Sequence, residues 1–132
     1  MKLERASTAG SKVLLILGWV MTAIPILMMG VGGVYTLYDS AAMDEGLRKQ
    51  GYAAHLGRVI LYLEIACVIV YAFPRTAILG AILLTGYLGG AVATHVRAED
   101  GMWPAPVVFG VIVWLGVFLR DARLRALIPW RR

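Results

Sequence analysis

Four long apolar stretches, separated by polar connections, set the pattern of this chain. They cover residues 13–37, 56–73, 76–96 and 103–119. A helix of about 20 residues crosses the hydrocarbon core of a bilayer, which is roughly 30 Å thick. Membrane-spanning strands alternate apolar and polar positions, whereas these stretches are continuous. The pattern therefore predicts an all-α fold, an integral membrane antiparallel four-helix bundle that makes a single transmembrane domain of residues 1–132.

The connections between the stretches support this arrangement. Residues 74–75 leave room only for a tight turn, so the second and third helices should form an antiparallel hairpin, with Thr76 as the N-cap of the third. The longest connection can hold a short surface helix over residues 41–49 after a Ser40 cap. Pro25 lies inside the first stretch and lacks a backbone donor, so we expect a kink there. Such a bend either lines a ligand site or is an ordinary feature of a membrane helix.

The composition agrees with a membrane protein and excludes several other classes. Apolar residues make up 60% of the chain and charged residues only 16%, while a soluble domain is about a quarter charged. Cys67 is the only cysteine, so the chain forms no internal disulfide, and two His with one Cys give no metal-binding cluster at a recognised spacing. The net charge is +5, but the basic residues lie beside the apolar stretches and not in a stripe. The predicted partner is therefore the lipid bilayer and not nucleic acid.

The distribution of basic residues predicts the orientation of the chain. Of the 13 Lys and Arg residues, nine lie on the side of the two termini and four on the other side. Because Lys and Arg accumulate in cytoplasmic loops, both termini should be cytoplasmic. The first apolar stretch is too long for a cleavable signal peptide and no A-x-A pattern closes it, so we interpret it as a retained span.

Glu64 is the most informative polar residue because it lies inside the second apolar stretch. A charged side chain exposed to lipid costs about 2.5–3.5 kcal/mol, so Glu64 should face the bundle interior. At 1.5 Å per residue it lies about 13 Å from the cytoplasmic end of its helix, level with Thr85 and Tyr87 on the third helix and with Thr22 on the first. These hydroxyls are its candidate partners. The carboxyl either locks helices together or belongs to a proton or ligand site.

A second polar group is predicted at the outer end of the bundle. His55 and His95 each lie about 27 Å from the inner end of their helices. Arg58 is one turn below His55, and Arg97 is just above His95. Such a group above a deeper carboxyl suits the polar head of a quinone or lipid, or a proton path. The alternative is that these side chains only reach out to water at the interface; no catalytic residue is assigned.

Small residues form one face of the third stretch. They include Gly86 and Gly90, four residues apart, together with Gly89 and Ala93. Small residues at this spacing let membrane helices approach closely. We interpret this face as a packing surface.

The residues around this face have a family resemblance. The run 74–97 reads PRTAILGAILLTGYLGGAVATHVR and resembles the third-helix signature of DoxX-like membrane proteins, as do residues 63–64 and the ending 119–129. The similarity covers about residues 51–129, and the first helix agrees only in general character. The resemblance implies a small four-helix protein of the bacterial inner membrane. The polar residues that match the family by position are Glu64, Thr94, His95 and Arg97.

The resemblance also implies three functional hypotheses. The family name comes from a subunit of a thiosulfate:quinone oxidoreductase, and some relatives are linked to membrane redox complexes. The first hypothesis is thus a non-autonomous redox subunit that binds a quinone or another small lipophilic ligand in a polar pocket open toward the periplasm. Distant relatives resemble assembly factors, including the acetylcholine-receptor chaperone of animals, so the second is a chaperone with a membrane-protein partner. The third is an enzyme acting on a small lipophilic substrate by acid–base chemistry; a homo-oligomer is compatible with each.

Overall fold

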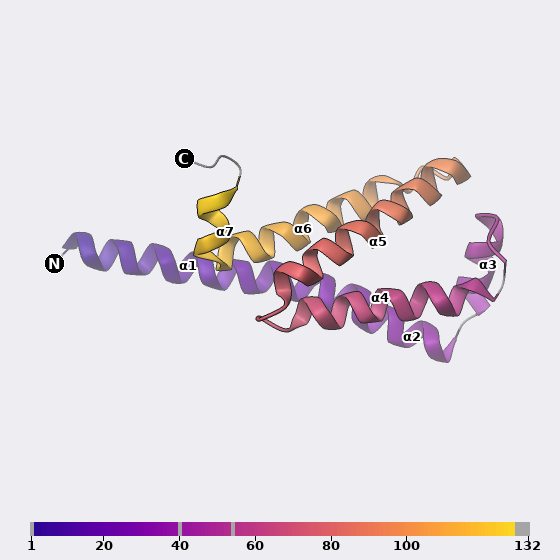
Figure 1. The fold of residues 1–132 in the computed structure, drawn as a ribbon, viewed down its shortest axis with the longest axis horizontal. Helices are drawn as coiled ribbons and strands as arrows, with labels where there is room; N and C mark the ends of the chain where they lie inside the picture. Colours follow the sequence, from indigo (N-terminus) through magenta and orange to yellow (C-terminus); the bar gives the residue numbers. More distant parts are fainter. Residues whose placement is uncertain (1, 40, 54, 129–132) are drawn as a thin grey trace.

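The computed structural model describes residues 2–39, 41–53 and 55–128, and within them every regular element is a helix. The expected Ser40 cap lies outside the described residues. The helices, drawn in Figure 1, are α1 (Lys2–Pro25), the π-helix η1 (Ile26–Val31), α2 (Gly32–Tyr38), α3 (Ala41–Lys49), α4 (Leu56–Ala72), α5 (Ala77–Ala98), α6 (Pro104–Arg120) and α7 (Ala122–Leu127).

The ends of α4, α5 and α6 lie close to those that the apolar pattern predicts, whereas α1 begins at Lys2, eleven residues before the first apolar stretch. The short helix α3 covers the predicted residues, and α5 continues two residues beyond its predicted end, so that His95 and Arg97 belong to its last turn. Thr76 precedes α5, but it does not cap it: its hydroxyl donates to the carbonyl of Val70 in α4 at 2.7 Å. The reason is its backbone, with φ −114° and ψ 6°, because a capping residue needs an extended conformation.

Pro25 changes the type of helix in the first apolar stretch. It is the last residue of α1, and six residues of π-helix follow it before α2 begins. A proline cannot donate to the carbonyl four residues earlier, here that of Met21. The sequence predicts a kink at Pro25, and the structure shows the wider turns of the π-helix η1 directly after it.

The helices pack in a cyclic order around a core near the α4–α5 turn. α1 packs against α6, α6 against α5 and α5 against α4, which also packs against η1 and α2. Tyr71, Leu84 and Val113 are completely buried there. A Cβ on Gly80 would lie 2.3 Å from the Cα of Tyr71, so α4 and α5 are in backbone contact close to their turn. Figure 1 shows the two helices diverging away from it.

The outer surface of the helices is apolar over much of its length. Ser11–Tyr38 and Ala77–Ala98 are long and apolar enough to cross a membrane, and Pro104–Arg120 is apolar but shorter. Only 22% and 28% of the most apolar windows of the first two are buried inside the protein, whereas the core helix of a soluble protein is mostly buried. These helices are suited to contact with lipid tails, and the four-span bundle stays a prediction.

Candidate functional site

The carboxyl group of Glu64 is hydrogen-bonded to α5. The hydroxyl of Tyr87 donates to its Oε2 at 2.7 Å, and both side chains are half-buried between α4 and α5. Of the three hydroxyls that lie level with Glu64, this is the one that reaches it. The turn between α4 and α5 is short, so it fixes which residues of the two helices lie at the same depth. The depth of Glu64, counted at 1.5 Å per residue, therefore predicted Tyr87 as its partner.

The other two hydroxyls bond elsewhere. Thr22 is buried in the core, where it donates to the carbonyl of Gly18 at 2.8 Å. Thr85 donates to the carbonyl of Ala81 at 2.7 Å and accepts from the indole N–H of Trp114 in α6 at 2.8 Å. Thr85 is two residues from Tyr87, a rotation of about 200° around the helix, so it faces α6 and not Glu64.

Tyr87 forms part of the wall of a cavity of about 570 Å³ between α3, α4 and α5. Apolar side chains such as Leu47, Ile60 and Leu63 line much of it. Its polar lining residues are Gln50, Tyr52, Tyr87, Thr94 and His95. Glu64 is not part of the lining and reaches the cavity through Tyr87.

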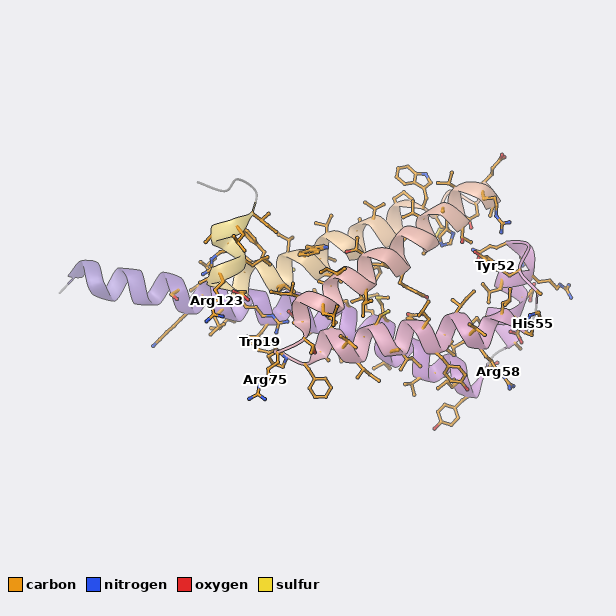
Figure 2. All side chains as sticks on the ribbon, in the orientation of Figure 1. Trp19, Tyr52, His55, Arg58, Arg75 and Arg123 are labelled. Carbon is orange, nitrogen blue, oxygen red and sulfur yellow. The ribbon has the colours of Figure 1, made fainter. Side chains whose placement is uncertain are left out.

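The polar end of the cavity is closed by the connection between α3 and α4. The hydroxyls of Tyr52 and Thr94 are hydrogen-bonded at 2.6 Å, and Arg97 donates to the backbone carbonyl of Gln50 at 2.6 Å. The guanidinium of Arg97 also lies over the Tyr52 ring, 5.4 Å from its centre. Figure 2 shows Tyr52 extending from this connection toward α5.

His95 belongs to the same polar end. Its Nδ1 lies 2.7 Å from Oδ2 of Asp100, and the amide of Gln50 lies 3.4 Å from the same ring nitrogen and donates to the same carboxylate oxygen at 3.4 Å. The hydrogen bond with His95, helped by the amide of Met102, lowers the pKa of Asp100. His95 is thereby held in one orientation, with its ring in the cavity wall.

The structure does not bring His55 and Arg58 to this cavity, so the expected rim of two His and two Arg is wrong for these two residues. His55 is exposed just before α4. Arg58 lines a separate cavity of about 100 Å³ with Asp44 and Tyr62. Figure 2 shows both on the side away from α5. Arg58 precedes Glu64 by six residues, which turns it to a different face of α4.

Sequence reasoning missed Gln50, Tyr52 and Asp100. The first two lie in the connection after α3, whose path no apolar periodicity determines. The glycine at position 51 was one signal in the sequence. Its φ is +80°, a conformation that favours glycine and that turns the chain back toward α5. Asp100 follows the left-handed Glu99 (φ 52°), which ends α5.

These features define a helical protein with apolar outer helix surfaces, which suit contact with lipid, and a half-buried polar cavity. A family model described as the DoxX-like family matches residues 20–116, more than half of the chain. The protein therefore belongs to the DoxX-like family of membrane proteins. The match includes Glu64 and the lining residues of α5, and it extends into the first helix, beyond the resemblance found from the residues alone. No curated protein and no solved structure matches the chain.

Proposed function

We propose that the protein is a non-autonomous subunit of a membrane redox system and holds a quinone, or a similar small lipophilic ligand, in the cavity between α3, α4 and α5. Pockets of roughly 300–1,000 Å³ with apolar walls and a few placed polar groups are typical of small-molecule sites. The cavity of about 570 Å³ fits this description. Its polar end suits an oxygen-bearing ring, and its apolar walls suit a hydrocarbon chain.

The hydrogen bond between Tyr87 and Glu64 carries the proposal. It joins a carboxyl inside an apolar helix to a hydroxyl in the cavity wall at 2.7 Å. Intramembrane carboxyls are costly and mark ligand or proton sites by default. Tyr87 can donate to a ligand oxygen when it releases Glu64, while Glu64 can hold a proton next to it. A bound quinone would supply the electron chemistry, and Tyr87 and His95 would orient it.

The glycines of α5 leave space for such a ligand. Gly86 and Gly90 line the cavity, and a Cβ on either would meet no atom within 4 Å. The chain has one cysteine, Cys67, so it cannot form the dithiol that would let it deliver electron pairs by itself. In this proposal a partner subunit supplies the electrons, and the protein acts as a subunit and not as a complete enzyme.

The proposed location is the bacterial inner membrane, with both termini cytoplasmic. α1 begins and α6 ends at the same end of the molecule as the α4–α5 turn (Figure 1), as an even number of crossings requires. In the sequence, nine of the 13 basic residues precede the first apolar stretch, lie in the 74–75 turn or follow residue 119, and the positive-inside rule makes that side cytoplasmic. The polar end of the cavity then lies on the periplasmic side.

The test is ligand retention by the full chain. Protein extracted gently from its own membrane should carry an isoprenoid quinone that native mass spectrometry detects. Glu64→Gln and Tyr87→Phe should each lower its occupancy about tenfold, since a hydrogen bond to a charged group contributes about 1.5–3 kcal/mol. Glu45→Gln, which removes an exposed carboxyl paired with Lys49 at 2.9 Å, should change nothing. Recovery of bulk phospholipid alone, or equal retention by all variants, would contradict the proposal.

A second candidate function is assembly of another membrane protein. A groove of about 620 Å³ between α5 and α6 is almost entirely apolar and includes Gly89 and Gly110. A Cβ on Gly89 would meet nothing within 4 Å, and exposed small residues let a partner helix approach closely. A stoichiometric polypeptide that survives Glu64→Gln but is lost with Gly89→Leu would favour this function. Turnover of a lipophilic substrate would instead favour an acid–base enzyme.

A further inference from the structure

The guanidinium of Arg120 lies at the end of α6 and forms no ion pair with any residue that the structure describes. Its carbon sits 4.4 Å from the centre of the Trp19 ring, so the cation stacks on the indole of α1. Its Nη2 is enclosed by protein, yet it has no hydrogen-bond partner among the described residues. A buried donor without an acceptor is costly, and more so when it is charged. Arg120 also lines a pocket at the surface, where a ligand can bring an acceptor to the rest of the guanidinium.

The nearest carboxylate in the sequence is already engaged. Oδ1 of Asp121 accepts the backbone N–H groups of Arg123 and Leu124 at 2.8 and 3.3 Å, which starts α7. The ring of Tyr71 also lies close to the guanidinium, 6.0 Å from its carbon. The hydroxyl of this tyrosine donates to the carbonyl of Val113. Neither neighbour forms a hydrogen bond or an ion pair with the guanidinium in the described part of the chain, although the Asp121 carboxylate also lines the pocket.

Arg120 lines a small pocket at the surface of the molecule. The pocket has a volume of about 170 Å³, several times the roughly 30 Å³ that one water molecule occupies in the liquid. Its walls come from three places: α1, the α4–α5 turn with the start of α5, and the α6–α7 corner. The residues are Leu15, Trp19, Pro74, Ala77, Ile78, Val117, Arg120 and Asp121.

We propose that this pocket binds the phosphate group of an anionic phospholipid. A guanidinium presents several N–H donors in a planar fork that matches phosphate oxygens. The pocket lies where α4 and α6 end and α5 begins, with Trp19 of α1 beside it, and tryptophans near the ends of membrane spans mark the headgroup level. Figure 2 shows Trp19, Arg75 and Arg123 at this same end, so further positive charge surrounds the pocket.

The neighbouring surface favours a lipid over free phosphate. Leu15, Trp19 and Ile78 line the pocket and are also exposed on the outer surface of α1 and α5. Acyl chains attached to a phosphate in the pocket can cover these side chains. Free phosphate would leave them bare. The site is separate from the α3–α5 cavity and does not depend on the function proposed for it.

The experiment compares lipids on the full-length protein. Protein stripped of lipid in detergent is titrated with phosphatidylglycerol, phosphatidylcholine or inorganic phosphate, and bound molecules are counted by native mass spectrometry. The wild type should bind one phosphatidylglycerol at least tenfold more tightly than phosphatidylcholine. Arg120→Gln should abolish this preference, and Arg120→Lys, which keeps the charge but not the fork, should reduce it in part. Arg75→Gln and Arg123→Gln, which remove exposed arginines at the same end, should change it less than threefold.

Three results would overturn the proposal. The first is equal binding of the two lipids by the wild type. The second is an equal loss in Arg120→Gln and Arg123→Gln, because general surface charge would then explain it. The third is binding of inorganic phosphate as tight as that of phosphatidylglycerol, because the acyl chains would then play no part. If Arg120→Gln fails to fold, Arg120→Lys provides the same comparison.

Discussion

Tyr71 shows how single polar groups are accommodated inside this apolar chain. It is completely buried, and its hydroxyl donates to the carbonyl of Val113 in α6 at 2.9 Å. That carbonyl lies inside a helix, so the bond adds a second donor to a group that already has its helical partner. The phenol thereby links α4 to α6 across the core.

Replacing Tyr71 with Phe tests the value of this bond. We expect Tyr71→Phe to lower the free energy of unfolding in detergent by about 1 kcal/mol, because the ring is kept and one buried hydrogen bond is lost. Tyr35→Phe is the matched control, since Tyr35 is 69% exposed, and it should leave the stability within about 0.5 kcal/mol. Chemical unfolding followed by tryptophan fluorescence measures both. Equal effects of the two changes would show that the bond contributes nothing.

The protonation of Asp100 gives a second prediction at this scale. Its hydrogen bond with His95 lowers its pKa from the ordinary value of 3.8. A carboxyl with a lowered pKa in the folded state stabilises the fold above its ordinary pKa, and this stabilisation is lost as the pH falls below that value. Unfolding midpoints should therefore fall more steeply below about pH 4 in the wild type than in Asp100→Asn. Glu99→Gln, the neighbouring change, should keep the wild-type pH profile.

At the scale of helices, glycines decide which surfaces come into contact. Gly80 and Gly89 both lie in α5, but a Cβ on Gly80 would meet the backbone of Tyr71 at 2.3–2.4 Å, while one on Gly89 would meet nothing. Gly80 is thus needed for the contact of α4 with α5. Gly89 leaves a free surface, on which a partner helix could pack if the protein assembles another membrane protein.

Alanine at these two positions should have opposite effects. Gly80→Ala should lower the free energy of unfolding by about 1–3 kcal/mol or more, because the clash is with backbone and the helices must move apart. Gly89→Ala should raise it by about 0.5–1 kcal/mol, since alanine fixes a helix better than glycine. Unfolding in detergent measures both. A stable Gly80→Ala protein would contradict the close packing of α4 on α5.

The positions of the helices follow from the sequence, while the site follows from it only in part. Apolar length favours helices for α4, α5 and α6, because a continuous apolar run that lipid covers pairs all its backbone groups within the segment only as a helix. The pairing of Glu64 with Tyr87 follows from the short hairpin, which fixes the register. The closure of the cavity by Tyr52 does not, because no repeating pattern directs the connection after α3. The position of Arg58 depends on the face of α4 that it occupies. Its depth along the helix is similar to that of His95, so depth alone could not show that Arg58 lies outside the cavity.

At the scale of the whole molecule, the two ends have different chemistry. One end holds the Arg120 pocket and the α4–α5 turn, and the other holds the α3–α5 cavity with His95 and Asp100. If the first end is cytoplasmic, the phosphate site faces the anionic inner leaflet, where each basic residue near the surface contributes about 1 kcal/mol. The ligand cavity then faces the periplasm. Both proposals therefore depend on one orientation.

Cysteine labelling tests this orientation. Cys67 is the only native cysteine and is buried, so the wild type should react little with a membrane-impermeant thiol reagent. Arg48→Cys and Arg123→Cys each place a thiol at an exposed position, the first in α3 and the second in α7. In intact cells stripped of the outer membrane, Arg48→Cys should label at once, whereas Arg123→Cys should label only after the inner membrane is permeabilised. The reverse pattern would show the opposite orientation, with the cavity on the cytoplasmic side. Labelling of both variants from outside would show that no membrane separates the two ends of the molecule.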